Sequence, residues 1–251
     1  MLWRVDNKAG EAMSFIKKGF LGLALLALAA CDVPVETSAP LPEASSGQAS
    51  QSQLSARAAA RQFVDVVETV EPVAERECRA RAPGMNCDFR IVIDDRPGQP
   101  VNAYQTLDKT GQPILAFTIA MIADVRNADE LAFVMGHEAA HHIEGHIARQ
   151  QRNAQTGALV FAGLAALTGA DAQVLQNVGE IGAQVGARTY SKDYELEADI
   201  LGTVITKKAG YNPVRGAAFF SRIPDPGDRF LGTHPPNAQR IEVVRQTASQ
   251  L

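Results

Sequence analysis

The chain has 251 residues, 46% of them hydrophobic, and a formal net charge of -4. This apolar content is sufficient for one core of moderate size, and one domain accounts for the length once the N-terminal segments are set aside. The charge provides no basic face for nucleic acid, and no glycine-rich phosphate loop precedes a helix, so we expect neither nucleic-acid nor nucleotide binding.

The N-terminal segment is predicted to be an export signal. Lys17 and Lys18 precede an apolar run over residues 19–30, which is too short to span a bilayer comfortably and ends in small residues, as a signal peptide does. Because Met13 stands at the usual distance before the two lysines, translation can start there. We interpret residues 1–30 as the signal peptide, of which residues 1–12 are an upstream extension if translation starts at Met13.

The stretch 28–31, Leu-Ala-Ala-Cys, resembles a bacterial lipobox, in which the signal is cleaved before the cysteine and that cysteine takes on lipid. The resemblance implies that a lipid on Cys31 tethers the mature chain to a membrane of the bacterial cell envelope, facing the periplasm. Asp32 favours inner-membrane retention in some bacteria but not in all, so the choice of membrane stays open. The alternative is ordinary cleavage with a soluble product, because small residues suit both kinds of cleavage.

A change in composition separates this signal from the folded domain. After the cysteine, residues 31–52 are rich in Pro, Ser, Ala, Gln and Gly, which cannot bury a core and predict a flexible tether. The folded domain is predicted over residues 53–251. Its two cysteines, Cys78 and Cys87, close a short loop, and in an oxidising periplasm such a pair is most simply a disulfide between the first helix and the first strand. A second metal site is weakly supported, since no nearby His or Cys completes it.

The first part of the domain predicts a helix followed by strands. Apolar residues recur at helical spacing at Phe63, Val66, Val67, Val70 and Ala74. Phe89, Ile91 and Ile93 then alternate as a strand. Residues 101–107 and 114–122 predict two more strands around a turn at 108–111, Asp-Lys-Thr-Gly. These elements indicate an α+β fold, mainly helical, with a small antiparallel sheet. If the outer strand is an open edge, an extended substrate can pair with it through main-chain hydrogen bonds, which would give broad peptide specificity.

The most informative motif is His-Glu-Ala-Ala-His at residues 137–141. The residues before it begin with N-cap and acidic types and then run apolar, which predicts a helix near 128–150. At about 100° per residue, His137 and His141 lie about 40° apart around the axis, so both imidazoles can reach one tetrahedral zinc ion. Glu138 lies beside them, free to act on water. The alternative is an ordinary amphipathic helix with a solvated polar face.

The neighbouring histidines are predicted to face elsewhere. On the same helix His142 and His146 would lie about 140° and 180° from His137, so neither can join the same metal. A metzincin would need Gly at 144 and His at 147, where this chain has Glu144 and Ile147. The third ligand must therefore come from another segment.

The segments after the motif predict further helices. Residues 157–170 and a helix over 171–187 are too short and too glycine-rich for a membrane span, and we expect a packed helical excursion there, with a mobile lid as the alternative. Gly210 with the following Tyr-Asn-Pro marks a helix stop, and residues 238–247 predict a last helix.

Acidic residues on a second helix supply the best candidate for the third ligand. Glu195 and Asp199 are one turn apart, so one carboxylate can bind zinc while Asp199 accepts the ring N–H of a ligand histidine. Glu197 points about 200° away from Glu195 and is solvated or structural in this interpretation. The alternative is an acidic helix start with no role in metal binding.

Together these motifs resemble the gluzincin peptidases of the HtpX and CAAX prenyl protease type, in particular their soluble periplasmic relatives. The resemblance runs from about residue 60 to the C-terminus. The matching pieces, in order, are Asn102-Ala103, Asp129-Glu130-Leu131-Ala132, Glu-x-Glu-Ala-Asp at 195–199, Thr233-His234-Pro235-Pro236 and Arg240-Ile241. It implies that His137, His141 and Glu195 bind one zinc ion per chain. It also implies that Glu138 is the general base. The multi-span membrane portion of the family is missing.

Two late residues are candidates for a further catalytic role. His234 and Arg240 could donate hydrogen bonds to the tetrahedral oxyanion of peptide hydrolysis. His234 could instead occupy the fourth position of the zinc ion at rest and keep the enzyme latent, or it could be a loop histidine with no role.

The function expected from this site is that of a zinc-dependent endopeptidase. Zinc-activated water, with Glu138 as general base, would hydrolyse peptide bonds. Polypeptide substrates follow from that chemistry, and unfolded or misassembled cell-envelope proteins are the substrates that the resemblance implies. The alternative is a zinc-binding periplasmic chaperone or assembly lipoprotein with little proteolysis, although Glu138 is intact beside both histidines. Nothing in the sequence pattern indicates an oligomeric state.

Overall fold

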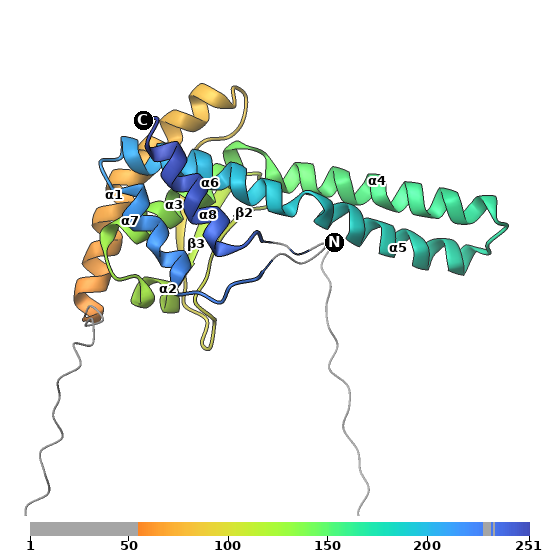
Figure 1. Ribbon diagram of the computed structural model, residues 1–251, viewed down its shortest axis with the longest axis horizontal. Helices are drawn as coiled ribbons and strands as arrows, with labels where there is room; N and C mark the ends of the chain where they lie inside the picture. The colour runs from red at the N-terminus through yellow and green to blue at the C-terminus, as the bar shows by residue number, and fades with distance from the viewer. Residues whose placement is uncertain (1–54, 228–231, 233) are drawn as a thin grey trace, which may run out of the picture. The chain divides into compact units, whose positions relative to one another are not determined.

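The structure, a computed structural model, describes residues 55–227, 232 and 234–251 (Figure 1). The predicted signal peptide and the whole predicted tether, with Cys31, lie outside these residues. The helices are α1 (Ala56–Arg81), α2 (Ile119–Asp124), α3 (Ala128–Ile143), α4 (His146–Leu167), α5 (Ala172–Thr189), α6 (Ser191–Lys208), α7 (Pro213–Gly216), the 3-10 helix η1 (Ala217–Ser221) and α8 (Asn237–Ala248). The strands are β1 (Arg90–Asp94), β2 (Ala103–Leu107) and β3 (Pro113–Thr118). The predicted α+β fold, mainly helical with one small sheet, is confirmed.

The sheet has the order β1-β3-β2 and is mixed. Strands β2 and β3 form the predicted antiparallel hairpin, and Gly111 in its turn adopts a φ of 84°. The prediction of a wholly antiparallel sheet is wrong, because β1 runs parallel to β3, with Arg90 opposite Ile114. The reason is that β3 lies between β1 and β2, so β1 pairs with the one strand that runs in its own direction. Among the described residues, strand β2 lies at an edge of the sheet, which meets the condition stated above for pairing with an extended substrate.

A threonine ends the third strand earlier than predicted. The apolar run 114–122 leaves the sheet at Thr118, whose hydroxyl accepts a hydrogen bond from the Met121 N–H at 3.1 Å and caps α2. The same hydroxyl accepts from the Asn102 N–H at 3.1 Å. The second half of the run therefore forms the short helix α2 instead of a strand.

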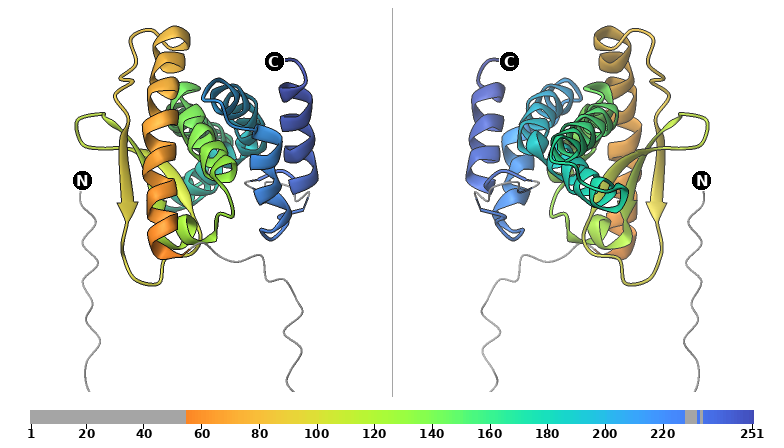
Figure 2. Two further views of the ribbon diagram at one scale, coloured as in Figure 1. Left: turned by 90° about the vertical axis from the view of Figure 1, so that its left-hand side faces the viewer. Right: turned by 90° about the vertical axis from the view of Figure 1, so that its right-hand side faces the viewer.

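The core is built around α3, which is buried along nearly its whole length. Helices α1, α3, α6 and α8 pack one against the next in that order, and Figure 2 shows α1 and α8 at opposite sides with α3 and α6 between them. The predicted apolar face of α1 is buried, and Phe63 meets Phe117 of β3 edge to face at 5.4 Å. Because α3 lies between α1 and α6, the histidine motif is packed from several sides.

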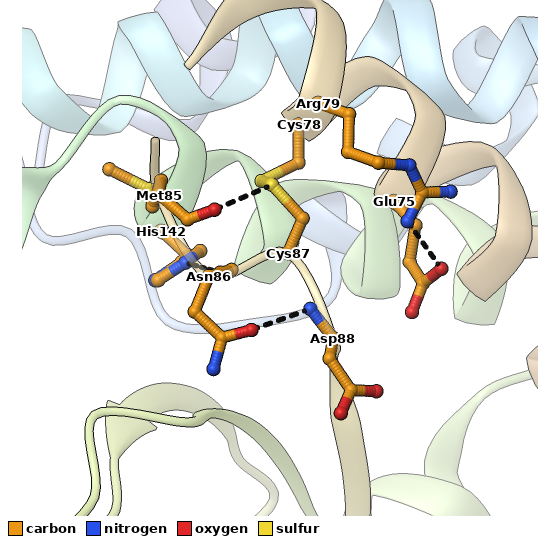
Figure 3. The surroundings of a disulfide bond; sticks show 8 residues. All are labelled: Glu75, Cys78, Arg79, Met85, Asn86, Cys87, Asp88 and His142. Atoms are coloured by element: carbon orange, nitrogen blue, oxygen red, sulfur yellow. Dashed lines mark hydrogen bonds and ion pairs between the residues drawn. A yellow bond between two sulfur atoms is a disulfide. The ribbon is translucent and has the colours of Figure 1, made fainter. Parts of the chain in front are cut away.

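The disulfide between Cys78 and Cys87 is present and joins the end of α1 to the chain just before β1, as predicted (Figure 3). The loop that it closes also contacts α3, because His142 Nε2 lies 2.7 Å from the backbone carbonyl of Asn86. His142 therefore faces the disulfide loop, in agreement with the prediction that it points away from the metal.

The prediction of one continuous helix near residues 128–150 is wrong, because α3 ends at Ile143 and the chain changes direction at Gly145 before α4 begins. This glycine has a φ of 67° and donates its N–H to the His142 carbonyl, which ends α3. A φ in this region is favourable for glycine and strained for most other residues. His146 thus begins a new helix, and its direction cannot be derived from the helical wheel of α3.

Helices α4 and α5 form a long hairpin that extends to one side (Figure 1). Glycines allow their backbones to touch, since a Cβ added at Gly157 would stand 2.0 Å from the Gly182 carbonyl oxygen. The expected helical excursion is therefore two helices packed on each other. Several of its large apolar side chains are exposed, among them Leu159, Leu164 and Leu167. Within the described part of the chain, no helix combines the length and the apolarity that crossing a membrane requires.

Candidate functional site

The start of α3 fixes the direction of the motif. Asn127 caps the helix by accepting the Glu130 N–H at 3.1 Å, as the sequence predicts. The buried carboxylate of Glu130 is held by Arg222 at 2.6 Å, and that of Asp129 by Arg215. These contacts anchor the first turn of α3, so that its last turns point the motif into a cleft.

Two histidines of α3 and one glutamate of α6 converge in this cleft. His137 Nε2 and His141 Nε2 lie 3.0 Å apart. The carboxylate of Glu195 lies 3.6 Å from His137 Nε2 and 3.4 Å from His141 Nε2. Among the described residues, this is the group of three His, Cys, Asp or Glu side chains whose ligand atoms are close enough to hold one metal ion. The structure thus brings together the three residues that the sequence singles out.

The spacing of these atoms fits a zinc ion. A tetrahedral ion with bonds of about 2.0 to 2.2 Å separates its ligand atoms by about 3.3 to 3.6 Å. The separations of 3.0, 3.4 and 3.6 Å are close to this range. Two imidazole nitrogens and one carboxylate oxygen are also a donor set that zinc accepts in hydrolases. The residues present therefore fit the metal that the sequence predicts.

A buried carboxylate supports the first histidine. Asp199 Oδ1 lies 3.0 Å from His137 Nδ1, and Arg240 holds both carboxylate oxygens of Asp199 at 2.7 Å. Asp199 is fully buried. Burial lowers the pKa of His137, but hydrogen bonds with Asp199 and Glu195 outweigh this and raise the pKa to about 9. The two carboxylates thus favour a cation at this ring, whether a proton or a metal.

The predicted general base and the edge strand line the same cleft. Its volume is about 970 Å³, and its walls include Glu138 beside the three clustered residues. Residues 102–105, at the start of β2, form another part of the wall. Aromatic side chains cover the floor near α3: Phe133, Phe219 and Phe220. An extended chain bound along β2 would therefore pass the metal cluster.

His234 and Arg240 both contact the carboxylate of Glu195. His234 Nδ1 lies 3.2 Å from Glu195 Oε2, and its side chain is 52% exposed. Arg240 Nη1 lies 3.3 Å from the same oxygen, and its guanidinium stacks on Phe220 at 3.9 Å. Arg240 is buried between Asp199 and Glu195, so its charge is already shared by two carboxylates. Thr233, before His234, lies outside the described residues.

His146 and Glu197 stay outside the metal cluster, as predicted, but sequence reasoning missed their contact with it. Because the chain turns at Gly145, His146 Nδ1 comes within 2.8 Å of His141 Nδ1. Glu197 lies 3.1 Å from His146 Nε2 and also binds Arg149. Of the two roles considered for Glu197, solvated or structural, these contacts indicate the structural one. Burial lowers the pKa of His146 to about 4, against the opposing effect of Glu197. Gly145 was the available signal for this contact.

Two helices that share one set of metal donors beside a cleft of substrate size are the arrangement of a metalloprotease of the gluzincin class. The comparison with known families agrees with it. Residues 60–248 match peptidase family M48, and the chain belongs to this family.

The chain is similar to several curated proteases. It is 30% identical over 147 residues to the beta-barrel assembly-enhancing protease of Escherichia coli O157:H7, and the match covers 50% of this chain and 28% of that protein. The protein of the same name from Yersinia pestis is also 30% identical over 147 residues. Metalloprotease YcaL of Escherichia coli (strain K12) is 25% identical over 158 residues, covering 59% of this chain and 62% of that protein. The match to the beta-barrel assembly-enhancing proteases thus spans 28% of their length.

Proposed function

We propose that this metalloprotease is a zinc-dependent endopeptidase of the bacterial cell envelope that cleaves unfolded or misassembled envelope proteins. The observation that carries the proposal is the convergence of His137, His141 and Glu195 in a cleft that also contains Glu138 and an edge strand. The name of the beta-barrel assembly-enhancing proteases supports the choice of substrate class.

In this proposal His137, His141 and Glu195 hold the zinc ion. When bound, zinc supplies Lewis acidity that polarises a peptide carbonyl and lowers the pKa of water towards 7. Glu138 accepts the proton of the attacking water and then donates it to the leaving amine. Its buried position on α3, next to His137, keeps it aimed into the cleft.

The edge strand β2 gives a means of holding the substrate. Its residues 103–105 line the cleft, and among the described residues β2 pairs with a strand on one side only. An extended peptide can add to the free side through main-chain hydrogen bonds, which require no particular sequence. Such binding suits unfolded chains, because folded proteins keep their backbone groups paired.

His234 and Arg240 have different roles in this proposal. Arg240 is a positioning residue, since both Asp199 and Glu195 share its guanidinium. His234 is half-exposed at the cleft and can donate a hydrogen bond to a developing oxyanion. We retain as the alternative that His234 blocks the site at rest.

The cellular location is part of the same proposal. The signal-like N-terminus and the lipobox-like residues around Cys31 support export and a lipid anchor, in the inner or the outer membrane. The disulfide between Cys78 and Cys87 supports an oxidising compartment such as the periplasm. A Cys31→Ala variant should leave the membrane fraction. An unchanged distribution would reject the lipid anchor.

The decisive experiment compares the purified protein with its Glu138→Gln variant on an unfolded protein substrate, each with and without a chelator. We expect cleavage by the wild type alone, and only without the chelator, because a glutamine amide cannot accept the proton of the attacking water. Zinc content should be equal in both proteins, which controls for loss of the site. Equal cleavage by both proteins would refute the proposal, and binding of unfolded protein without cleavage would favour the chaperone alternative.

A further inference from the structure

A chain of three side chains leads away from the second predicted zinc ligand. His141 directs Nε2 at the cluster, and its Nδ1 lies 2.8 Å from His146 Nδ1. The other ring nitrogen of His146 lies 3.1 Å from the Glu197 carboxylate. His146 is only 5% exposed, so water cannot easily replace these partners. The chain therefore connects Glu197 of α6 to His141 of α3 through the first residue of α4.

The two hydrogen bonds permit one consistent placement of protons. An ionised carboxylate only accepts hydrogen bonds, so the His146 Nε2 carries the proton that points at Glu197. In a neutral ring the Nδ1 of His146 is then the acceptor, and the proton between the rings belongs to His141 Nδ1. This leaves a lone pair on His141 Nε2, which is the atom that faces the metal cluster. The direction of both bonds thus presets His141 for metal binding.

Further contacts hold His146 in place. Its ring stacks on Tyr194 with 4.7 Å between centroids and 15° between planes. The Tyr194 hydroxyl accepts a 2.6 Å hydrogen bond from the Asn153 amide, and Arg149 binds Glu197 while lying 4.3 Å from the Tyr194 ring centroid. Tyr194 precedes the ligand Glu195 on α6, so the elements that supply the cluster also hold its support.

We propose that His146, oriented by Glu197, is a positioning residue that fixes the ring and the tautomer of His141 for metal binding. The two histidine ligands are then supported in different ways. His137 is supported directly by the buried carboxylate of Asp199. His141 is supported indirectly, because it contacts His146, and His146 in turn contacts the carboxylate of Glu197. The inference rests on the proposed zinc site and deepens it.

The test measures metal affinity in the variants His146→Phe and His146→Gln. Phenylalanine keeps the stacking on Tyr194 and removes both hydrogen bonds, whereas a glutamine amide can accept from His141 and donate to Glu197. We expect the Phe variant to bind Zn²⁺ about 10- to 100-fold more weakly in competition with a chromophoric chelator, with an unchanged Tm of the metal-free protein. The Gln variant should recover most of the affinity, and the visible absorption of bound Co²⁺ should change in the Phe variant only.

A second pair of variants tests the far end of the chain. Glu197→Met removes the acceptor of His146, whereas Arg152→Met, at an exposed position of α4, leaves every contact of His146 in place. We expect weaker Zn²⁺ binding in the first and nearly wild-type binding in the second. Wild-type affinity in His146→Phe, or equal losses in the Phe and Gln variants, would overturn the inference while leaving the proposed function intact. Failure of the wild type to bind Zn²⁺ would overturn both.

Discussion

Gly202 of α6 lies directly against the backbone of His137 in α3. A Cβ atom at Gly202 would stand 2.9 Å from the His137 nitrogen and 3.0 Å from its Cα. The fit is reciprocal, because a Cβ at Gly136 would stand 2.9 Å from the Gly202 carbonyl oxygen. Since α3 carries both histidines and α6 carries Glu195, this close crossing sets the distance between the three proposed zinc ligands.

We expect Gly202→Ala to push the two ligand helices apart. The added methyl group meets backbone atoms that cannot rotate away, so the free energy of unfolding should fall by about 1 to 3 kcal/mol. Zinc affinity should fall as well, because Glu195 moves with α6. Urea denaturation and chelator competition measure the two effects. Ile200→Ala, at an exposed position of the same helix, is the control. Unchanged zinc affinity in Gly202→Ala would show that the crossing does not set the ligand spacing.

Asp199→Asn should damage both stability and metal binding. The substitution removes one of the two carboxylates that share the buried Arg240 guanidinium, and breaking a buried pair costs about 3 to 5 kcal/mol. An amide can also turn its NH₂ towards His137, which would disturb the ring and lower zinc affinity about 10- to 100-fold. Denaturation of the metal-free protein and chelator competition separate the two losses. Asp193→Asn, exposed on the same helix, should behave like the wild type, and a similar result for Asp199→Asn would contradict the proposed support of His137.

The sequence alone predicts the parts of this site that depend on regular periodicity. The one-turn spacings of His137 with His141 and of Glu195 with Asp199 survive in the structure because α3 and α6 are uninterrupted at these residues. The contact of His146 could not be predicted in the same way. It depends on the positive φ of Gly145, which turns the chain between α3 and α4. A helical wheel assumes one continuous helix, so it cannot give the direction of a residue after such a turn.

The errors in the fold have a similar cause. A strand pattern does not say which neighbour a strand pairs with, so the parallel pairing of β1 with β3 depends on a long-range choice of partner. The early end of β3 depends on a single hydroxyl, that of Thr118, which caps α2 within an apolar run that also suits a strand. The local sequence pattern predicted that strands β1 and β3 exist. The pairing of β1 and the end of β3 were decided by contacts that the pattern does not contain.

The α4–α5 hairpin should depend on its glycines. In Gly157→Ala the new methyl group would stand 2.0 Å from the Gly182 carbonyl oxygen, so the helices must separate. We expect lower thermal stability of the hairpin and faster cleavage within it during limited proteolysis. Gly163→Ala is a matched control on the same helix, because nothing lies within 4 Å of the added atom. That control should be neutral or stabilising by up to about 1 kcal/mol. Equal proteolysis of both variants would show that this glycine contact does not hold the hairpin.

Removing the disulfide should lower stability without removing the metal site. A Cys78→Ala, Cys87→Ala double variant frees a short loop in the unfolded chain, which costs about 2 to 3 kcal/mol of stability for a loop of this length. The effect should appear in urea denaturation, and dithiothreitol should lower the wild-type stability by a similar amount while leaving the double variant unchanged. A fall in zinc affinity together with stability would contradict this prediction. It would show that the disulfide loop affects the metal site, through the contact of His142 with the carbonyl of Asn86.

His234→Ala distinguishes the two proposed roles of this residue. The ring lies 3.2 Å from Glu195 Oε2 and is half-exposed at the cleft, so its removal should leave the fold and zinc affinity nearly unchanged. If His234 donates a hydrogen bond to the oxyanion, kcat should fall about 100- to 1,000-fold with little change in KM, because that bond forms only in the transition state. We expect this result from steady-state cleavage of a fluorogenic peptide, with Glu138→Gln as the inactive reference. A rise in kcat would instead identify His234 as a latch that blocks the site at rest, because its removal would then open the cleft to substrate.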